Sequence, residues 1–211
     1  HQRTSFMVGH IPTPGGPLAT DRTECRSGRT INLASSSPVT LCPMTERAEP
    51  NGTSIVDVTD PAKPKYLAHI PGQEGKYEGG GAQMVRVCDG KGLPKGDPNA
   101  VYMLRTFGGQ GHEMWDVTKP DSPAFITRVS WDLKDTHKNV WECDTGIAFL
   151  VSGVSTWRIR RMTEVFDLSD PTKPVKIRDF GLDGQQPGTT GAVPSELHGA
   201  VSTGKAGNRL Y

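Results

Sequence analysis

One pattern of apolar and polar positions occurs three times along the chain, over residues 53–70, 112–129 and 163–180. The three copies align without a gap, and positions three, four and six of each copy are apolar. A short run that is apolar on both faces predicts a β-strand in a sheet that is covered on both sides. The apolar residues are Ile55, Val56 and Val58; Met114, Trp115 and Val117; and Val165, Phe166 and Leu168.

The polar positions of the repeat predict how each strand ends. Position five is aspartate, position seven carries a hydroxyl group, and positions nine and twelve are proline in every copy. Proline cannot donate to a ladder, and aspartate and hydroxyl side chains can hydrogen-bond a turning backbone. Each copy therefore predicts a β-hairpin, in which we interpret the repeated aspartates as turn residues. The residues are Asp57, Asp116 and Asp167; Thr59, Thr118 and Ser169; Pro61, Pro120 and Pro171; and Pro64, Pro123 and Pro174.

Two further strands are predicted before the second hairpin, over residues 82–89 and 100–107, and two before the third, over 138–144 and 146–153. Two strands and a hairpin make a four-stranded antiparallel unit of about fifty residues, the size of one propeller blade. The sequence predicts an all-β fold, a partial β-propeller with about three to four blades represented over residues 53–211. The chain is expected to end inside the last blade.

Residues 1–52 do not share the repeat. They are predicted to form one N-terminal strand and then a long loop over residues 12–52 that is rich in Gly, Pro and Ser. Cys25 and Cys42 flank part of this loop, so they are a candidate disulfide. Such a bond would stabilise the loop by roughly 3 kcal/mol and would require an oxidising compartment.

Cys88 and Cys143 end the first strand of two adjacent units. A disulfide requires that their Cα atoms lie within about 7 Å of each other. First strands of neighbouring blades are expected to lie further apart at these ends. The sequence therefore favours two buried free thiols over a disulfide.

Composition and charge narrow the classes of partner. The 211 residues include 24 basic and 23 acidic side chains, and a net charge of +1 gives no reason to expect a nucleic acid or an anionic membrane as partner. No apolar run is long enough to predict a transmembrane helix. The 25 glycines and 17 prolines favour short strands and tight turns over helices. The chain begins at His1 without a signal-peptide pattern, so a processed form is expected.

The cores VDVTDPAKP, WDVTKPDSP and FDLSDPTKP resemble LVIVD repeats, which occur in β-propeller proteins that are commonly exported. The segment HGAVSTGKAGNRLY is similar to a strand pair of YVTN-type surface-layer propellers. The resemblance covers about residues 53–211 and leaves 11–50 unmatched. It implies a propeller fold and a periplasmic, extracellular or cell-surface location. It implies no shared catalytic motif.

Histidines are the best candidates for chemistry. His137 and His198 are predicted to lie at nearly the same level of neighbouring blades, at one mouth of the channel. Together with His112 and Glu196 they form a candidate site for a transition metal such as Zn, Cu or Fe. The alternative reading is that His137 and His198 hydrogen-bond the nearby backbone.

Two glutamates share repeat position two, Glu113 and Glu164. Paired carboxylates can perform acid–base chemistry when a pocket raises the pKa of one of them. Recurrence at one repeat position favours a structural role instead, because the two residues belong to different blades.

Two functions remain open at this point. The first is an exported binding or scaffold protein that takes a protein, a glycan or a small ligand on its loop face. The alternative is a metal-dependent hydrolase or oxidase that uses the histidines. In either case, further blades or a second chain are expected to close the propeller.

Overall fold

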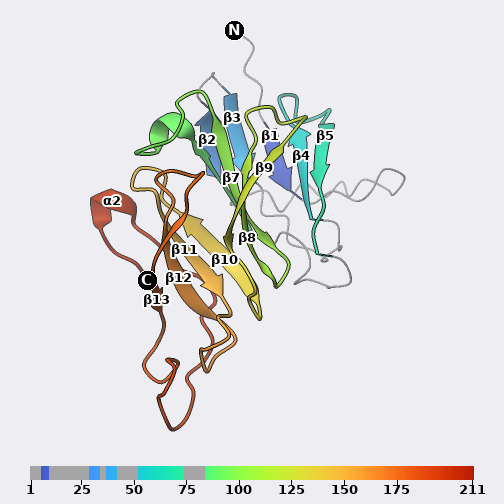
Figure 1. Cartoon of the computed structure of the whole chain (residues 1–211). Helices are drawn as coiled ribbons and strands as arrows, with labels where there is room; N and C mark the ends of the chain where they lie inside the picture. The colour runs from blue at the N-terminus through green and yellow to red at the C-terminus, as the bar shows by residue number, and fades with distance from the viewer. Residues whose placement is uncertain (1–5, 10–28, 34–36, 42–51, 74–83) are drawn as a thin grey trace.

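The structure is a computed structural model that describes residues 6–9, 29–33, 37–41, 52–73 and 84–211. Within these residues, strands form three sheets, and the helices are single turns (Figure 1). The all-β prediction is confirmed. No helix in the described ranges has the length and apolar character that crossing a bilayer requires.

The second and third sheets are four-stranded and antiparallel, and each keeps its strands in chain order. Each sheet ends in a repeat hairpin, as the sequence predicts. The second sheet contains β6 (Val85–Asp89), β7 (Val101–Phe107), β8 (Gly111–Asp116) and β9 (Ala124–Ser130), with the single turn η2 (Gly90–Gly92) after β6. The third contains β10 (Thr136–Trp141), β11 (Ile147–Ser152), β12 (Met162–Asp167) and β13 (Val175–Phe180).

The first sheet has five strands in the order β2-β3-β1-β4-β5. The first repeat hairpin forms its β4–β5 edge, and β1 pairs antiparallel to β4 but parallel to β3. This mixed order differs from the two four-stranded sheets. Its strands are β1 (Phe6–Gly9), β2 (Arg29–Leu33), β3 (Ser37–Leu41), β4 (Thr53–Asp57) and β5 (Lys65–Ile70).

Residues 12–52 are not one continuous loop, because β2 and β3 form an antiparallel hairpin within them. Their sequences, RTINL and SPVTL, contain the β-branched residues that suit a strand. Each strand is only five residues long and is surrounded by Gly, Pro and Ser, so no period stands out in the sequence. Cys25 and Cys42 lie outside the described residues.

The second sheet is covered on both faces, which explains why the repeat is apolar on both faces. Trp115, at repeat position four, packs in a cluster with Ile55 of the first sheet. Met114, at position three, is fully buried in a cluster with Phe166 of the third sheet. Position three therefore faces the following sheet, and position four faces the preceding one.

The third sheet is covered less completely. Val165 occupies repeat position three, where Ile55 and Met114 are 1% and 0% exposed, but Val165 is only half-buried. Phe149 and Val140 lie beside it in register on β11 and β10, and both are also half-buried. The third sheet thus presents an apolar row on the face that points away from the second sheet.

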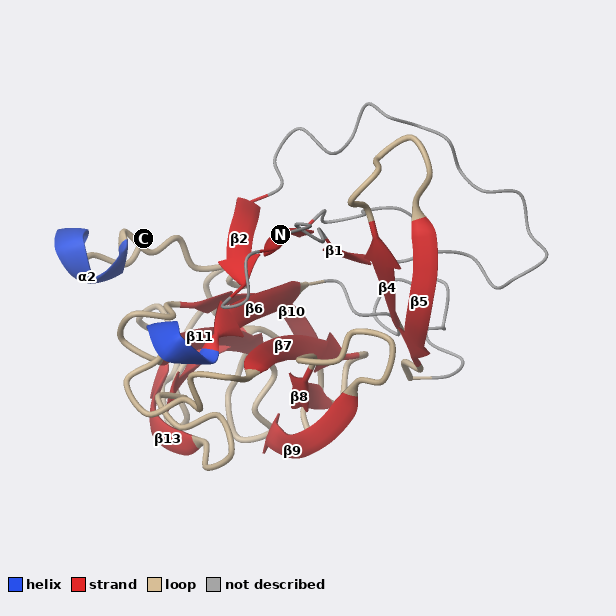
Figure 2. Ribbon diagram, turned by 90° about the horizontal axis from the view of Figure 1, so that it is seen from above, coloured by secondary structure: helices blue, strands red, loops and turns tan. Residues whose placement is uncertain are grey.

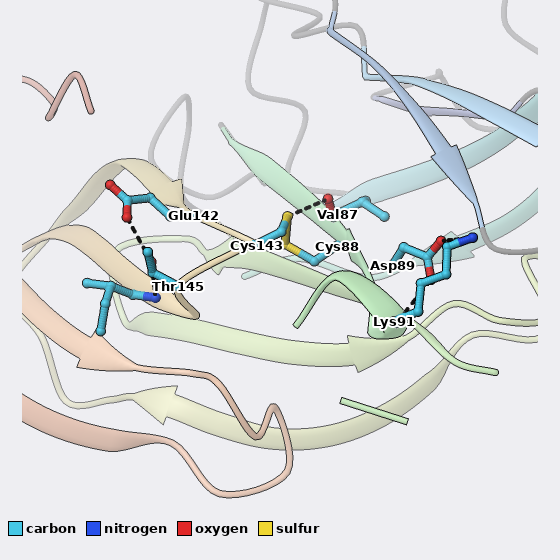
Figure 3. The surroundings of a disulfide bond; sticks show 8 residues. Val87, Cys88, Asp89, Lys91, Glu142, Cys143 and Thr145 are labelled. Carbon is cyan, nitrogen blue, oxygen red and sulfur yellow. Dashed lines mark hydrogen bonds and ion pairs between the residues drawn. A yellow bond between two sulfur atoms is a disulfide. The ribbon is translucent and has the colours of Figure 1, made fainter. Parts of the chain in front are cut away.

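The prediction of free thiols at Cys88 and Cys143 is wrong, because the two residues form a disulfide (Figure 3). Their Cα atoms lie 5.5 Å apart. Adjacent sheets approach each other closely at their first strands, as a second contact shows: Asn139 on β10 donates to the carbonyl of Met84 beside β6 at 3.3 Å. This close approach brings equivalent residues of neighbouring sheets within bonding distance.

A single β-bridge lies beside the third sheet. Val201 and Tyr211 exchange two backbone hydrogen bonds of 2.8 Å, and Ser202 bridges Leu210 around the single turn α2 (Gly204–Gly207). The Ser202 hydroxyl donates to the carboxylate of Glu142, close to Cys143. Residues 201–211 therefore contact the chain just after β10, as that part of the chain contacts the end of β6 through Cys143.

Candidate functional site

The repeated aspartates all act within their turns. The Oδ1 atom of each accepts a hydrogen bond from the backbone N–H two residues later, at 2.8 to 2.9 Å. For Asp167, hydrogen bonds from the Ser169 hydroxyl and amide lower the pKa of the carboxyl group. These carboxylates are occupied in shaping the hairpin. The pairs are Asp57 with Thr59, Asp116 with Thr118, and Asp167 with Ser169.

Glu113 lies at the joint between the first and second sheets. Its Oε2 atom accepts from Arg105 Nε at 2.9 Å, from Arg105 Nη2 at 2.8 Å and from the Trp115 indole at 2.9 Å. Arg105 is 1% exposed and also donates to the carbonyls of Ile70 and Pro71, at the end of β5. Burial lowers the pKa of Arg105, and the neighbouring Glu113 opposes this shift. The pair fastens the two sheets together.

Glu164 lies at the matching joint between the second and third sheets. It accepts from the Ser130 hydroxyl at 2.6 Å, at the end of β9, and pairs with Lys176 Nζ at 2.9 Å. Ser130 follows the second hairpin as Pro71 follows the first. The two glutamates recur because each joins its own sheet to the end of the preceding hairpin. Both are almost fully buried, and each already has a partner.

His112 is also part of a joint. It is fully buried, and its Nε2 atom lies 3.2 Å from Ser152 Oγ on β11. Burial lowers its pKa to about 4, and the negative charge of Glu164 opposes the shift only in part. Since solvent does not reach the ring, His112 is not positioned to act on a dissolved substrate.

His137 and His198 lie next to each other. Their ring centroids lie 4.6 Å apart, with an edge-to-face angle of 67°. His137 lies near the start of β10 and is half-buried, whereas His198 lies 61 positions later and is exposed. His137 comes after the end of β9, and His198 comes after the end of β13. Both strands lead away from a repeat turn, so the pair lies at the opposite end of the third sheet.

Charged residues surround this histidine pair. Asp135 accepts from Arg161 Nε at 2.8 Å and pairs with Arg160 Nε at 3.2 Å. Arg160 Nη2 also lies 3.2 Å from Glu196 Oε2. Burial is the main reason that the pKa of His137 is lowered to about 4; the positive charges of Arg161 and its neighbours add to the shift. The ring of His137 is therefore neutral at neutral pH.

The loop that brings His198 into place is built around one buried amide. Gln185 is 0% exposed; its Oε1 accepts from the backbone of Leu182 at 2.8 Å, and its Nε2 donates to the carbonyl of Ser195 at 2.6 Å. Arg158 reaches across from the preceding loop and donates to the carbonyls of Gly184 and Gly191. The loop extends from the lower end of the third sheet in Figure 1.

The structure does not bring the three predicted metal ligands together. Among the described residues, no group of three or more His, Cys, Asp and Glu side chains is placed to hold a metal ion. His137 and His198 are neighbours, while His112 lies between the second and third sheets. The cluster contains two imidazoles, three cationic side chains and two carboxylates that the arginines bind. Its charged residues are Lys138, Arg160, Arg161, Asp135 and Glu196.

Sequence reasoning missed Arg158, Arg160, Arg161 and Gln185. The available signal was the run TWRIRRM, which places three arginines in a connection that breaks the repeat. Nothing in the sequence identifies Gln185 as the buried centre of its loop. Viewed from above (Figure 2), the chain after β13 continues as loop and then the turn α2.

The chain matches no protein-family model, and no curated protein is significantly similar to it.

Proposed function

We propose that the protein is an exported β-propeller module that binds a ligand at the loop end of its sheets. The stacking supports the propeller: position three packs forward and position four packs backward, which is the relation between neighbouring blades. The half-buried row of Val140, Phe149 and Val165 then takes a further sheet of the same kind, in this chain or in a second one. The β-bridge between Ser202 and Leu210 contacts Glu142, which follows the first strand of the third sheet.

One observation carries the binding function. The repeated polar residues are all engaged in turns or in joints between sheets, whereas polar residues that do not repeat gather around His137 and His198. These residues come from the start of β10 and from the connections around it, and a buried glutamine and an arginine hold the loop after β13 in place. Loops held on a rigid scaffold are where proteins commonly place binding residues. Binding explains the cluster better than metal-dependent catalysis, since His112 lies apart from the other two histidines.

The disulfide supports export. Cys88 and Cys143 join neighbouring sheets, and disulfides persist mainly in oxidising compartments. Alkylating the protein in intact cells with a thiol reagent tests this location. We expect Cys88 and Cys143 to be protected as a disulfide in the cell-envelope or secreted fraction. Full alkylation of both residues in a cytoplasmic fraction would refute export.

The binding proposal is tested with a combined loop-end variant, His137→Ala/Glu196→Ala/His198→Ala. Wild type and variant are immobilised and exposed to glycan arrays and to cell-envelope extract. A matched control, Asp121→Ala/Lys173→Ala, changes exposed residues at the opposite, turn end of the sheets. We expect a ligand that wild type and control retain and the loop-end variant loses. Equal retention by all three proteins would show that the loop end is not the binding site.

A further inference from the structure

The cluster around His137 holds hydrogen-bond donors that no described residue uses. Arg161 contacts both Asp135 and Glu196 through Nε, and its two Nη nitrogens donate no hydrogen bond to the described residues. The amine of Lys138 likewise pairs with no residue that the structure describes. Arg161 is 21% exposed, so its unused donors lie close to the surface and are partly shielded from water.

The charge around the two rings is positive. Lys138, Arg160 and Arg161 contribute three cations, while Asp135 and Glu196 contribute two carboxylates that the arginines already bind. A divalent metal ion at the rings would be repelled by this excess of positive charge. A negatively charged ligand would instead be attracted, because charge-assisted hydrogen bonds are the strongest that side chains form.

We propose that this cluster binds an oxyanion group of the ligand, with Arg161, Lys138 and His198 as its donors. The inference rests on the proposed loop-end binding function and names the chemical class of its ligand. A guanidinium presents a planar fork of N–H groups that matches the two oxygens of a carboxylate. His198 is exposed beside His137 and offers a ring nitrogen to the same group.

The donors are held in place before the ligand arrives. Leu197 N–H donates to the carbonyl of Arg161 at 3.2 Å, so the segment with His198 is fixed to the segment with Arg161. Gly199 packs directly on Lys138: a Cβ at position 199 would lie 3.1 Å from Lys138 Cβ. Such preorganisation reduces the entropy lost when a ligand binds.

Isothermal titration at low ionic strength tests the proposal, with glucuronate, glucose and inorganic phosphate as probes. Glucuronate differs from glucose by its carboxylate, and phosphate shows whether a tetrahedral oxyanion is preferred. We expect glucuronate or phosphate to bind and glucose not to bind. Lys138→Gln and His198→Gln should each weaken that binding about tenfold, as the loss of one charge-assisted hydrogen bond predicts.

Lys173→Gln is the matched control, because it removes the same charge from an exposed position in the third repeat turn. It should bind as wild type does, and circular dichroism should show all three variants folded. The inference is overturned if glucose binds as well as glucuronate, or if Lys138→Gln and His198→Gln bind as tightly as Lys173→Gln. It is also overturned if Zn²⁺ binds stoichiometrically and is lost in His198→Gln. Retention of a neutral ligand at the loop end would refute this inference and leave the binding function standing.

Discussion

At the scale of single residues, the polar groups buried between sheets have structural consequences that can be measured. His112 is fully buried beside Ser152, and Arg105 is buried between Glu113 and the backbone of the preceding sheet. Water reaches neither side chain. His112 is therefore stable only as a neutral ring, and Arg105 is stable only with its hydrogen-bond partners. His112 is a candidate metal ligand in the sequence only because its burial cannot be seen there.

His112 should make stability depend on pH. Its pKa in the folded protein is about 4, below the ordinary value of 6.5, so the unfolded chain binds the proton more readily. The contribution of neutral His112 to the free energy of unfolding is complete above pH 6.5. It is lost as the pH falls towards 4, and the total loss is about 3 kcal/mol. Urea unfolding of wild type and His112→Gln is measured at pH about 7 and about 4.5. Between these two pH values, the free energy of unfolding should fall less for the variant than for wild type. Equal falls would contradict the assignment; exposed His198→Gln serves as the control.

Arg105 and Glu113 should behave as a coupled pair. Arg105→Met leaves the Glu113 carboxylate buried without its main partner, and we expect a loss of about 3 to 5 kcal/mol in the free energy of unfolding. Adding Glu113→Leu should recover a large part of that loss, because the unpaired charge is gone. A double-mutant cycle measures the coupling, and additive effects would show that the pair does not join the sheets.

At the scale of elements, the hairpin is the best-predicted part of the molecule. The apolar triplet, the aspartate and the prolines specify strand, turn and strand, and the structure contains all three hairpins. In every copy the pairing register also shifts between positions three and four, at Ile55/Val56, Met114/Trp115 and Val165/Phe166. This recurring bulge was not predicted, since it depends on how two strands pair and not on either strand alone.

The turn hydrogen bond should contribute measurably to stability. Asp116→Ala removes the acceptor of the Thr118 amide and should cost about 1 kcal/mol. Asp116→Asn keeps an acceptor oxygen and should cost less than half as much. Asp121→Ala, an exposed change in the same turn, removes the same charge and should be nearly neutral. Thermal unfolding of the three variants decides the matter; an equal loss in all of them would point to charge and not to the turn.

At the scale of the whole molecule, contacts between sheets decide how stable the protein is and which sheet faces are covered. The disulfide Cys88–Cys143 spans 55 positions and ties the second sheet to the third. The polar joint at Glu164 ties the same two sheets at the other end of the strands, and the joint at Glu113 ties the first sheet to the second. The array is thus held at both ends of its strands as well as by its apolar clusters.

Removing the disulfide should destabilise the protein substantially. In the chain-entropy model a loop of this length corresponds to about 4 kcal/mol, so Cys88→Ser/Cys143→Ser should lose about that much in urea unfolding. A reducing agent should then not lower the stability of this variant any further through positions 88 and 143. Cys25→Ser/Cys42→Ser is the matched control and should keep the response of Cys88 and Cys143 to reduction. Wild-type stability in the first variant would contradict the role assigned to the bond.

The apolar row on the third sheet should promote association of the isolated chain. Phe149→Glu places a charge in the row and should give monomers under conditions in which wild type forms larger species. Tyr66→Glu, at an exposed position of the first hairpin, should leave association unchanged. Light scattering coupled to size exclusion measures both. A wild-type monomer that binds no hydrophobic dye would show that the row needs no covering sheet.

The sequence alone determined the hairpins, the four-stranded units and the turn role of the repeated aspartates, because all of these depend on residues close together in the chain. It also predicted His137 and His198 at nearly the same level, although His198 lies in a loop and not in a strand. Tertiary structure decided what depends on the distance between sheets: the disulfide at Cys88 and Cys143, the burial of His112, and the joints made by Glu113 and Glu164. No local pattern encodes how closely two sheets approach, because that distance is set by the packing of side chains from both.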